Sequence, residues 1–324
     1  MIVVTGGAGF IGSAIVWRLN ALGLDDILVV DLPGTENHPN LAALSYRDFL
    51  TKDEFATAFE RGGFGGGIEV IFHMGACSDT TNTDEEYLAE NNTGYTRRLA
   101  VASLAQGVRF IYASSAATYG DGSEGYVDDH GGIERLRPLN LYAKSKQEFD
   151  RWALGEGLLD RIAGLKYFNV FGPNEYHKGD MRSMILKGYE QIRDTGKIRL
   201  FRSDRPEYGD GEQDRDFIFV KDAVEMTLFF WEHSRANGIF NIGSGAPATW
   251  NTLARAIYDA IGEKPAIEYV DMPESLKGKY QYHTCAVMDK LNTAGYVNPA
   301  TPFTDAVREY IRDYLVTGAY LTNL

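Results

Sequence analysis

Three side chains have the types and spacing needed to move a proton at a hydroxyl group. Tyr142 and Lys146 are four residues apart, so on a helix they share one face. A free tyrosine has a pKa of about 10, and a lysine ammonium together with a nicotinamide cation close by would lower that pKa. Ser115 follows a strand predicted at residues 108–114, and its hydroxyl would lie at the carboxyl edge of the sheet. The set predicts general acid–base chemistry at a substrate hydroxyl.

A glycine-rich turn predicts the second reactant, a dinucleotide. Gly6, Gly9 and Gly12 stand between a short apolar strand and a helical segment. Such glycines allow a tight turn, close approach of a pyrophosphate and close helix–strand packing, and the helix amides face the phosphates. Asp31 ends the next strand, at the ribose-binding position, and taken alone it favours NAD over NADP. Lys52 could supply positive charge nearby, so cofactor choice stays open at this point.

The elements that must position these residues alternate between strand and helix. Apolar runs predict strands at 2–5, 27–30, 69–73 and 108–114, and helical spacing predicts helices at 10–22 and 84–106, the second capped by Thr83. Buried strands separated by helices predict an α/β fold, a Rossmann doubly wound parallel sheet. We expect an NAD(P)-binding domain at 1–168 with a return segment around 215–245. A smaller mixed α/β substrate-binding domain should occupy mainly 169–324.

The later half shows shorter elements. Helices are expected at 181–195, 222–233 and 251–261, and strands at 197–201, 216–220, 239–242 and 267–270.

Composition excludes several classes of function. The 324 residues carry 32 basic and 45 acidic side chains, a net charge of −13, which argues against nucleic-acid binding. Cys77 and Cys285 are far apart, and no pair of the six histidines has zinc-site spacing, so we expect neither disulfide nor metal. No apolar stretch is long enough for a membrane span, and a cytoplasmic setting is expected.

Four motifs together resemble the extended short-chain dehydrogenase/reductase family, which acts mainly on nucleotide sugars. They are residues 5–12 (TGGAGFIG), 114–120 (SSAATYG), Tyr142 with Lys146, and 167–173 (YFNVFGP). The resemblance implies a bound NAD(P) and a catalytic trio of Ser115, Tyr142 and Lys146. Ala116 and Ala117 stand where sugar-nucleotide 4,6-dehydratases carry an Asp-Glu pair, which argues against dehydration.

Three further segments are similar to one branch of that family, the epimerases that invert C6 of the heptose in an ADP-activated sugar. They are 72–78 (FHMGACS), 172–181 (GPNEYHKGDM) and 276–281 (LKGKYQ). The implied reaction belongs to lipopolysaccharide core synthesis. Inversion requires hydride to leave one face of C6 and return to the other, so a single acid–base group would be misplaced for one orientation. The resemblance implies that Tyr142 serves one half-reaction and Lys178 the other.

The same resemblance implies further contacts. Cofactor contacts are implied for Gly6, Gly9, Phe10, Ile11, Gly12, Asp31, Lys52, Gly75, Ala76, Cys77, Ser78, Asn92, Lys146 and Val170. Substrate contacts are implied for Ser115, Asn169, Asp180, Lys187, Phe201, Arg215 and Tyr280. Arg215 suits a pyrophosphate because its guanidinium can form paired hydrogen bonds, whereas the competing interpretation is an ion pair with Asp214 or Asp216.

The chain departs from the family pattern at several positions. Asp180 replaces a small hydroxyl residue, Lys187 a histidine and Met74 a glutamate, and residues 35–37 lack a basic residue. We expect one tightly held NADP per subunit, with NAD possible because of Asp31. The partners expected are a small-molecule ADP-sugar and further copies of the chain in a homo-oligomer.

Two other functions fit the same motifs. One is a different nucleotide-sugar epimerase of the family, such as a UDP-hexose 4-epimerase, which should tolerate loss of Lys178. The other is a catalytically inactive NAD(P)-binding sensor, against which the intact Ser115, Tyr142 and Lys146 argue.

Overall fold

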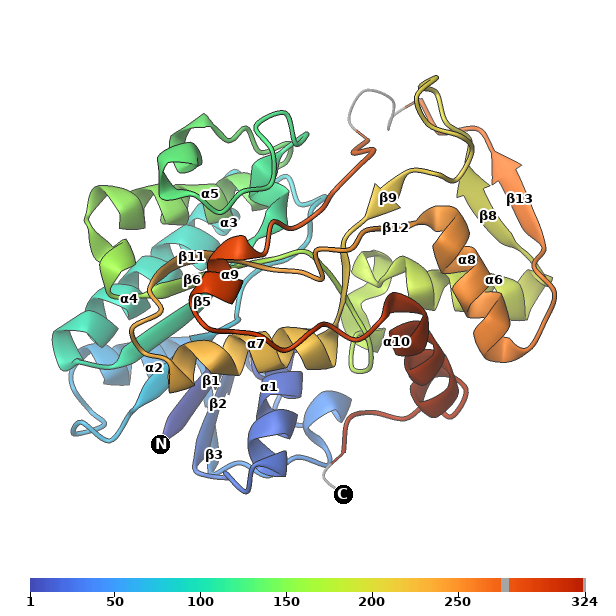
Figure 1. Ribbon diagram of the computed structural model, residues 1–324. Helices are drawn as coiled ribbons and strands as arrows, with labels where there is room; N and C mark the ends of the chain where they lie inside the picture. The colour runs from blue at the N-terminus through green and yellow to red at the C-terminus, as the bar shows by residue number, and fades with distance from the viewer. Residues whose placement is uncertain (275–279, 323–324) are drawn as a thin grey trace.

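A seven-stranded parallel sheet forms the larger part of the protein (Figure 1). The computed structural model describes residues 1–274 and 280–322. The order across the sheet is β11-β6-β5-β4-β1-β2-β3, and every neighbouring pair is parallel. Its strands are β1 (Ile2–Thr5), β2 (Ile27–Asp31), β3 (Asp48–Thr51), β4 (Val70–His73), β5 (Arg109–Ser115), β6 (Ala163–Tyr167) and β11 (Gly238–Ile242).

Helices cover both faces of this sheet because successive strand residues point to opposite sides. Val4 packs into a core that includes α1 (Phe10–Ala21) and α7 (Val220–Glu232). The adjacent Val3 packs into the other core, beneath α2 (Lys52–Glu60), α4 (Tyr95–Gln106) and α5 (Leu141–Gly155). This layering confirms the predicted Rossmann fold class.

A smaller group of elements lies apart from the sheet, at the right of Figure 1. There β8 pairs in parallel with β13, next to α6 and α8, and α10 packs on α8. The remaining bounds are α3 (Glu85–Leu88), α6 (Met184–Thr195), α8 (Trp250–Ile261), α9 (Asp289–Thr293), α10 (Phe303–Glu309), β7 (Asn169–Phe171), β8 (Ile198–Phe201), β9 (Asp214–Arg215), β10 (Phe217–Phe219), β12 (Ala248–Thr249) and β13 (Ile267–Val270). In the described part of the chain, no helix could cross a membrane.

Three predicted elements differ from the structure. The helix expected at 84–106 is α3, a π-helical turn at Ala89–Gly94 and then α4, and Asp84 rather than Thr83 caps it. The strand expected at 216–220 is the shorter β10, because α7 already begins at Val220, and β9 lies before the predicted range. The helix expected from residue 181 begins at Met184, because Ser183 caps it after a 3₁₀ turn at Tyr176–Met181. Several elements were not predicted, among them β3, α2, β6, β7, α9 and α10.

Candidate active site

A cavity of about 910 Å³ opens at the carboxyl ends of the sheet strands. Thr5, Asp31, Met74, Ser115 and Tyr167 line it from the ends of β1, β2, β4, β5 and β6. Ligands of doubly wound sheets bind at this edge. The cavity continues to Trp250 and Gln281, so both parts of the molecule form its wall.

The glycine-rich turn forms a cradle that larger residues would fill. Gly6 has a φ of +67°, and a Cβ there would lie 2.6 Å from the backbone nitrogen of Gly75. A Cβ on Gly12 would lie 2.0 Å from the Gly6 carbonyl oxygen. Helix α1 begins at Phe10 directly after the turn, so its amino terminus faces the cavity. Bare backbone beside a helix amino terminus fits the pyrophosphate of a dinucleotide.

Asp31 lies at one end of this cavity with both carboxylate oxygens engaged. One accepts a hydrogen bond from the Ala8 backbone N–H and the other from that of Leu32, each at 2.8 Å. Lys52 bonds to the Asn91 side chain and lies 5.7 Å from the Tyr95 ring. His38 lines the same region. This end of the cavity therefore presents the Asp31 carboxylate, the Lys52 amine and the His38 imidazole.

The predicted catalytic trio converges on the cavity. Asn140 caps α5 by accepting a hydrogen bond from the Ala143 N–H at 2.8 Å, which places Tyr142 in the first turn. The Ser115 side chain hydrogen-bonds to the Tyr142 hydroxyl. Lys146 is buried one turn further along the helix and donates to the Ala113 carbonyl oxygen at 2.8 Å. Strand β5 and helix α5 thus fix all three groups.

The protein's own groups do not lower the pKa of Tyr142, whose predicted lowering also involves the cation of a bound nicotinamide. Burial raises the pKa of Tyr142, and the Ser115 hydrogen bond only partly offsets this increase. Burial also lowers the pKa of Lys146, to about 8.

Lys178 reaches the same cavity from a different part of the chain. It lies in the 3₁₀ turn Tyr176–Met181, and its Nζ is 5.2 Å from the centre of the Phe10 ring. Burial lowers the pKa of Lys178, and the neighbouring Glu175 carboxylate opposes that shift. Two groups able to exchange protons therefore face one cavity from separate elements.

Asn92 lies behind the cavity instead of lining it. In the π-helical turn it accepts a hydrogen bond from the Cys77 N–H and donates to the Cys77 carbonyl oxygen and the Ser145 hydroxyl, all at 2.9 Å. The adjacent Asn91 lines the cavity. Every other residue predicted to contact the cofactor lines the cavity, and so do all four residues predicted to be catalytic.

The residues named for the substrate fall into three places. Asn169 lines the cavity. Phe201 and Tyr280 pack edge to face, and the Arg215 guanidinium lies 5.1 Å from the Tyr280 ring and 5.6 Å from that of Trp250. Asp180 lies in the 3₁₀ turn and Lys187 in α6, and the lysine donates a hydrogen bond to the Asp180 backbone carbonyl oxygen. Of the motif at 276–281, residues 276–279 lie outside the described residues.

Arg215 is a buried cation without an ion pair among the described residues, and 8% of it is exposed. It donates to the carbonyl oxygens of Asp214 and Gln281. The Asp214 carboxylate contacts His283 at 2.6 Å, and that of Asp216 accepts from backbone groups. The competing interpretation, an ion pair of Arg215 with either aspartate, is therefore not what the structure shows.

Several residues of the cavity wall were not predicted. They are His38, Asn140, His177, Trp250, Gln281 and Thr284. Helix capping by Thr249 could have placed Trp250 at the start of α8, but nothing local placed that helix at the cavity. Gln281 reaches the site because its side chain bonds to the Gly120 carbonyl, 161 residues earlier in the chain.

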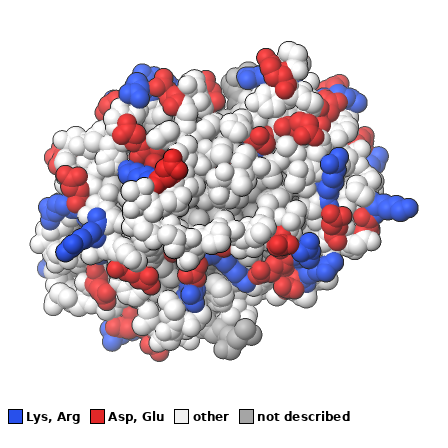
Figure 2. All heavy atoms as spheres, in the orientation of Figure 1, with Lys and Arg blue, Asp and Glu red and all other residues white. Residues whose placement is uncertain are grey.

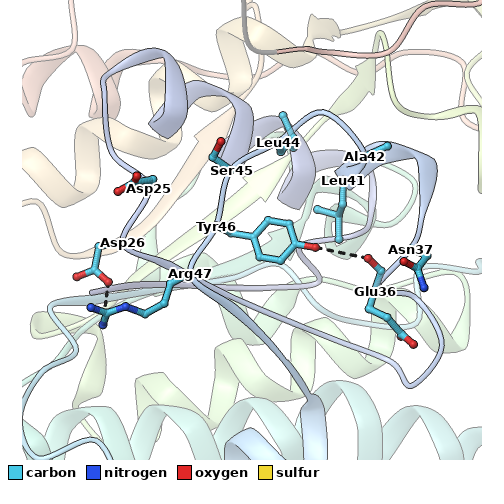
Figure 3. A pocket seen from close by; sticks show the side chains of 10 residues that line it. All are labelled: Asp25, Asp26, Glu36, Asn37, Leu41, Ala42, Leu44, Ser45, Tyr46 and Arg47. Atoms are coloured by element: carbon cyan, nitrogen blue, oxygen red, sulfur yellow. Dashed lines mark hydrogen bonds and ion pairs between the residues drawn. The ribbon is translucent and has the colours of Figure 1, made fainter.

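A second hollow of about 660 Å³ lies near the amino end of β2 (Figure 3). Its polar groups satisfy one another: Asp26 contacts Arg47 at 3.0 Å, and the Tyr46 hydroxyl donates to the Glu36 carbonyl at 3.5 Å. On the face shown in Figure 2, acidic and basic side chains are interspersed around a mainly uncharged centre. Neither feature competes with the first cavity as a site for chemistry.

Comparison with known proteins identifies the family. Residues 2–243 match the NAD dependent epimerase/dehydratase family. The chain belongs to this family. An ADP-L-glycero-D-manno-heptose-6-epimerase of Nitratidesulfovibrio vulgaris (strain DP4) is 53% identical, over 98% of this chain and 99% of the relative. An enzyme of the same name from Fusobacterium nucleatum is 41% identical, over 97% and 98%.

Among solved structures, that of the Helicobacter pylori ADP-L-glycero-D-manno-heptose-6-epimerase is similar to the structure of this protein, with a TM-score of 0.78. The two are 23% identical, and the match covers 96% of this chain and 95% of the other. That similarity is one of fold. The family resemblance predicted from the four motifs is confirmed.

Proposed function

We propose that the protein converts ADP-D-glycero-D-manno-heptose into ADP-L-glycero-D-manno-heptose, by oxidation at C6 and reduction from the opposite face. The observation that carries this proposal is the Lys178 side chain, which lines the same cavity as Tyr142 from a separate segment. Relatives that carry the name of this epimerase, at 41% and 53% identity, support the same substrate.

The nicotinamide, when bound, supplies a reversible acceptor for the hydrogen and electron pair of C6. The cradle of Gly6, Gly9 and Gly12 would hold its pyrophosphate, and Asp31 its ribose. In one half-reaction the Tyr142 hydroxyl exchanges a proton with the substrate O6. Ser115 is the hydrogen-bond partner of Tyr142 in this step. In the other, the Lys178 amine exchanges that proton after the C6 carbonyl has turned over. Burial supports this role, because it lowers the pKa of Lys178 and lets the amine act as a base.

Arg215 is the group proposed to hold the diphosphate of the sugar nucleotide. Its guanidinium is buried between the Trp250 and Tyr280 rings, and burial lowers its pKa. An anion would supply the countercharge that the described residues do not. Phe201 and Tyr280 offer aromatic surface beside it for the nucleoside.

We propose NADP as the cofactor, held tightly at one per subunit, with NAD as the alternative that Asp31 favours. Lys52 and His38 are the groups at the ribose end that could face a 2′-phosphate. Acid release and mass spectrometry of the nucleotide from freshly purified protein decide the point. NADP is expected, and NAD alone would contradict this choice.

We further propose a cytoplasmic homo-oligomer that acts in lipopolysaccharide core heptose synthesis. Both cysteines, Cys77 and Cys285, are free thiols, which suits a reducing compartment. Light scattering on the purified holoenzyme would measure the subunit number, and a monomer would contradict the assembly.

The experiment that tests the function is NMR of the C6 proton of ADP-D-glycero-D-manno-heptose mixed with the purified protein, without added cofactor. The L-glycero epimer is expected to appear. No reaction, even after NADP and then NAD are added, would contradict the proposal. A panel of UDP- and GDP-sugars would then find the substrate of a related epimerase.

A further inference from the structure

The segment that presents Lys178 is short and lies largely at the surface. His177, Gly179 and Asp180 in the 3₁₀ turn are exposed. The turn is broken at Gly179, whose φ of 52° and ψ of −123° are not helical. Such a segment does not fix a lysine by packing alone, although acid–base catalysis requires the amine to be held within reach of its proton.

Directly before this turn, the Glu175 carboxylate is buried and fixes both ends of the segment. None of the Glu175 surface is exposed. Its Oε1 accepts hydrogen bonds from the Gly172 N–H at 3.3 Å and from the Ser183 hydroxyl at 2.7 Å. Its Oε2 accepts from the Ser183 N–H at 2.5 Å. The loop from Glu175 to Ser183 is thus closed on one carboxylate, and Ser183 also caps α6.

Asn174, the residue before Glu175, anchors the amino end of the same turn. It has a φ of 77°, the one positive value outside glycine in the described residues. Its amide donates to the Ser13 hydroxyl at 3.0 Å, and its Oδ1 accepts from the Leu321 N–H at 2.9 Å. Ser13 belongs to α1, as does Phe10, whose ring lies beneath the Lys178 ammonium. The base of the loop is therefore fixed to the helix that lines the cofactor cradle.

We infer that Glu175 is a positioning residue for Lys178: its buried carboxylate closes the loop that holds the lysine amine at the cavity. It acts through Lys178 and touches neither substrate nor cofactor. The inference rests on the proposed function for the half-reaction that Lys178 serves. Because Tyr142 is held by α5 and β5, loss of the Glu175 contacts should impair one half-reaction and spare the other.

The first test needs no substrate. Holoenzyme is treated briefly with acetic anhydride at about pH 10, and acetylation of Lys178 is quantified by mass spectrometry relative to the exposed Lys197. Glu175→Gln is expected to raise the acetylation of Lys178 several-fold because the loop is released. Glu309→Gln, which changes a carboxylate that contacts Lys221 in α7, is the matched control and should match wild type. Unchanged acetylation in Glu175→Gln would overturn the inference.

The second test measures the two half-reactions. Each heptose epimer is mixed rapidly with holoenzyme, and reduced nicotinamide is followed by absorbance. Glu175→Gln is expected to slow reduction by one epimer about 100-fold, the epimer that Lys178→Met slows most. Equal slowing with both epimers would show a merely structural role. If Glu175→Gln fails to fold, Ser183→Ala removes one link to the same carboxylate and should give the same asymmetry.

Failure of the proposed function is distinguishable from failure of this inference. If wild-type holoenzyme reduces its nicotinamide with neither epimer, the proposed substrate is wrong, and the acetylation of Lys178 still decides the role of Glu175.

Discussion

The two groups proposed to transfer protons, Tyr142 and Lys178, are held by two different kinds of structure. Tyr142 stands in the first turn of a fifteen-residue helix, next to the end of a central strand. Lys178 stands on a six-residue 3₁₀ turn whose ends meet on a buried carboxylate. Regular hydrogen bonding and apolar packing position the first group, whereas a few specific polar contacts position the second.

This difference explains what each region tolerates. A helix packed on a sheet distributes its stability over many small contacts, so single losses shift the active group little. The conformation of a loop held by one carboxylate depends on a few hydrogen bonds. Loss of any one of these buried bonds costs free energy because it leaves a polar group without a partner. We expect variants near Lys178 to lose activity before stability, and variants around Tyr142 and Lys146 to lose stability first.

The largest expected effect comes from removing either proton-transfer group. Tyr142→Phe and Lys178→Met should each slow epimerisation by about 10²–10⁴-fold, because the complete reaction needs both groups. NMR of the C6 proton measures this rate. Lys144→Met, which changes an exposed lysine paired with Glu85, is the control and should retain normal activity. A Lys178→Met protein with more than about a tenth of wild-type activity would remove Lys178 from the mechanism and favour a 4-epimerase.

The next effect tests the rigidity of the region around Tyr142. Lys166 and Asp150 form a fully buried ion pair at 2.6 Å between β6 and α5. Lys166→Met should lower the free energy of unfolding by about 3–5 kcal/mol, because it leaves the Asp150 carboxylate buried and unpaired. Urea denaturation measures the change. The exposed pair of Lys144 with Glu85 provides the comparison, and Lys144→Met should cost less than about 1 kcal/mol. Similar losses in both variants would contradict the contrast.

A pH-dependent effect follows from burial of Lys146. Its pKa is lowered to about 8 in the folded protein, whereas the unfolded chain keeps the proton up to its ordinary value of 10.5. Between these values the unfolded state binds more protons, so stability should rise with pH relative to Lys146→Met. The full difference is about 3 kcal/mol, of which about 2 kcal/mol develops between pH 8 and pH 10. Urea titrations of both proteins at about pH 8 and about pH 10 measure it, and parallel pH dependences would show that Lys146 is not held neutral.

The smallest effect concerns the cap of the catalytic helix. Asn140→Ala removes the hydrogen bond to the Ala143 N–H and should cost about 1 kcal/mol of stability. Asn140→Asp keeps an acceptor and should stay close to wild type. Thermal unfolding of the three proteins checks the order. An Asn140→Asp loss as large as that of Asn140→Ala would mean that the amide group, rather than capping, matters.

The same contrast governs how much could be predicted from the sequence. Apolar runs gave β1 and β2 nearly to the residue, because buried parallel strands have a strong local pattern. The glycine cradle and the Tyr142–Lys146 pair could also be predicted, because each is defined by residues that lie close together in the sequence. The Lys178 loop has no periodicity, so only family resemblance pointed to its lysine.

Contacts between distant segments explain what sequence reasoning missed. The π-helical turn shifts the register of its helix, so Asn91 lines the cavity and Asn92 supports the Cys77 segment. Nothing near Glu175 reveals that Ser183 closes on its carboxylate, since the residues between them form a short 3₁₀ turn without apolar periodicity. Gln281 and Trp250 reach the site through contacts of the later half that no local pattern encodes.

The central claim is that C6 is inverted by removal and return of the same hydrogen. It is tested most directly with ADP-D-glycero-D-manno-heptose deuterated at C6, converted in ordinary water by the purified holoenzyme and examined by NMR and mass spectrometry. Retention of deuterium at C6 of the L-glycero product is the predicted result, because the hydrogen leaves and returns with its electron pair. Replacement of the deuterium by solvent hydrogen would show proton abstraction from C6 and contradict the account.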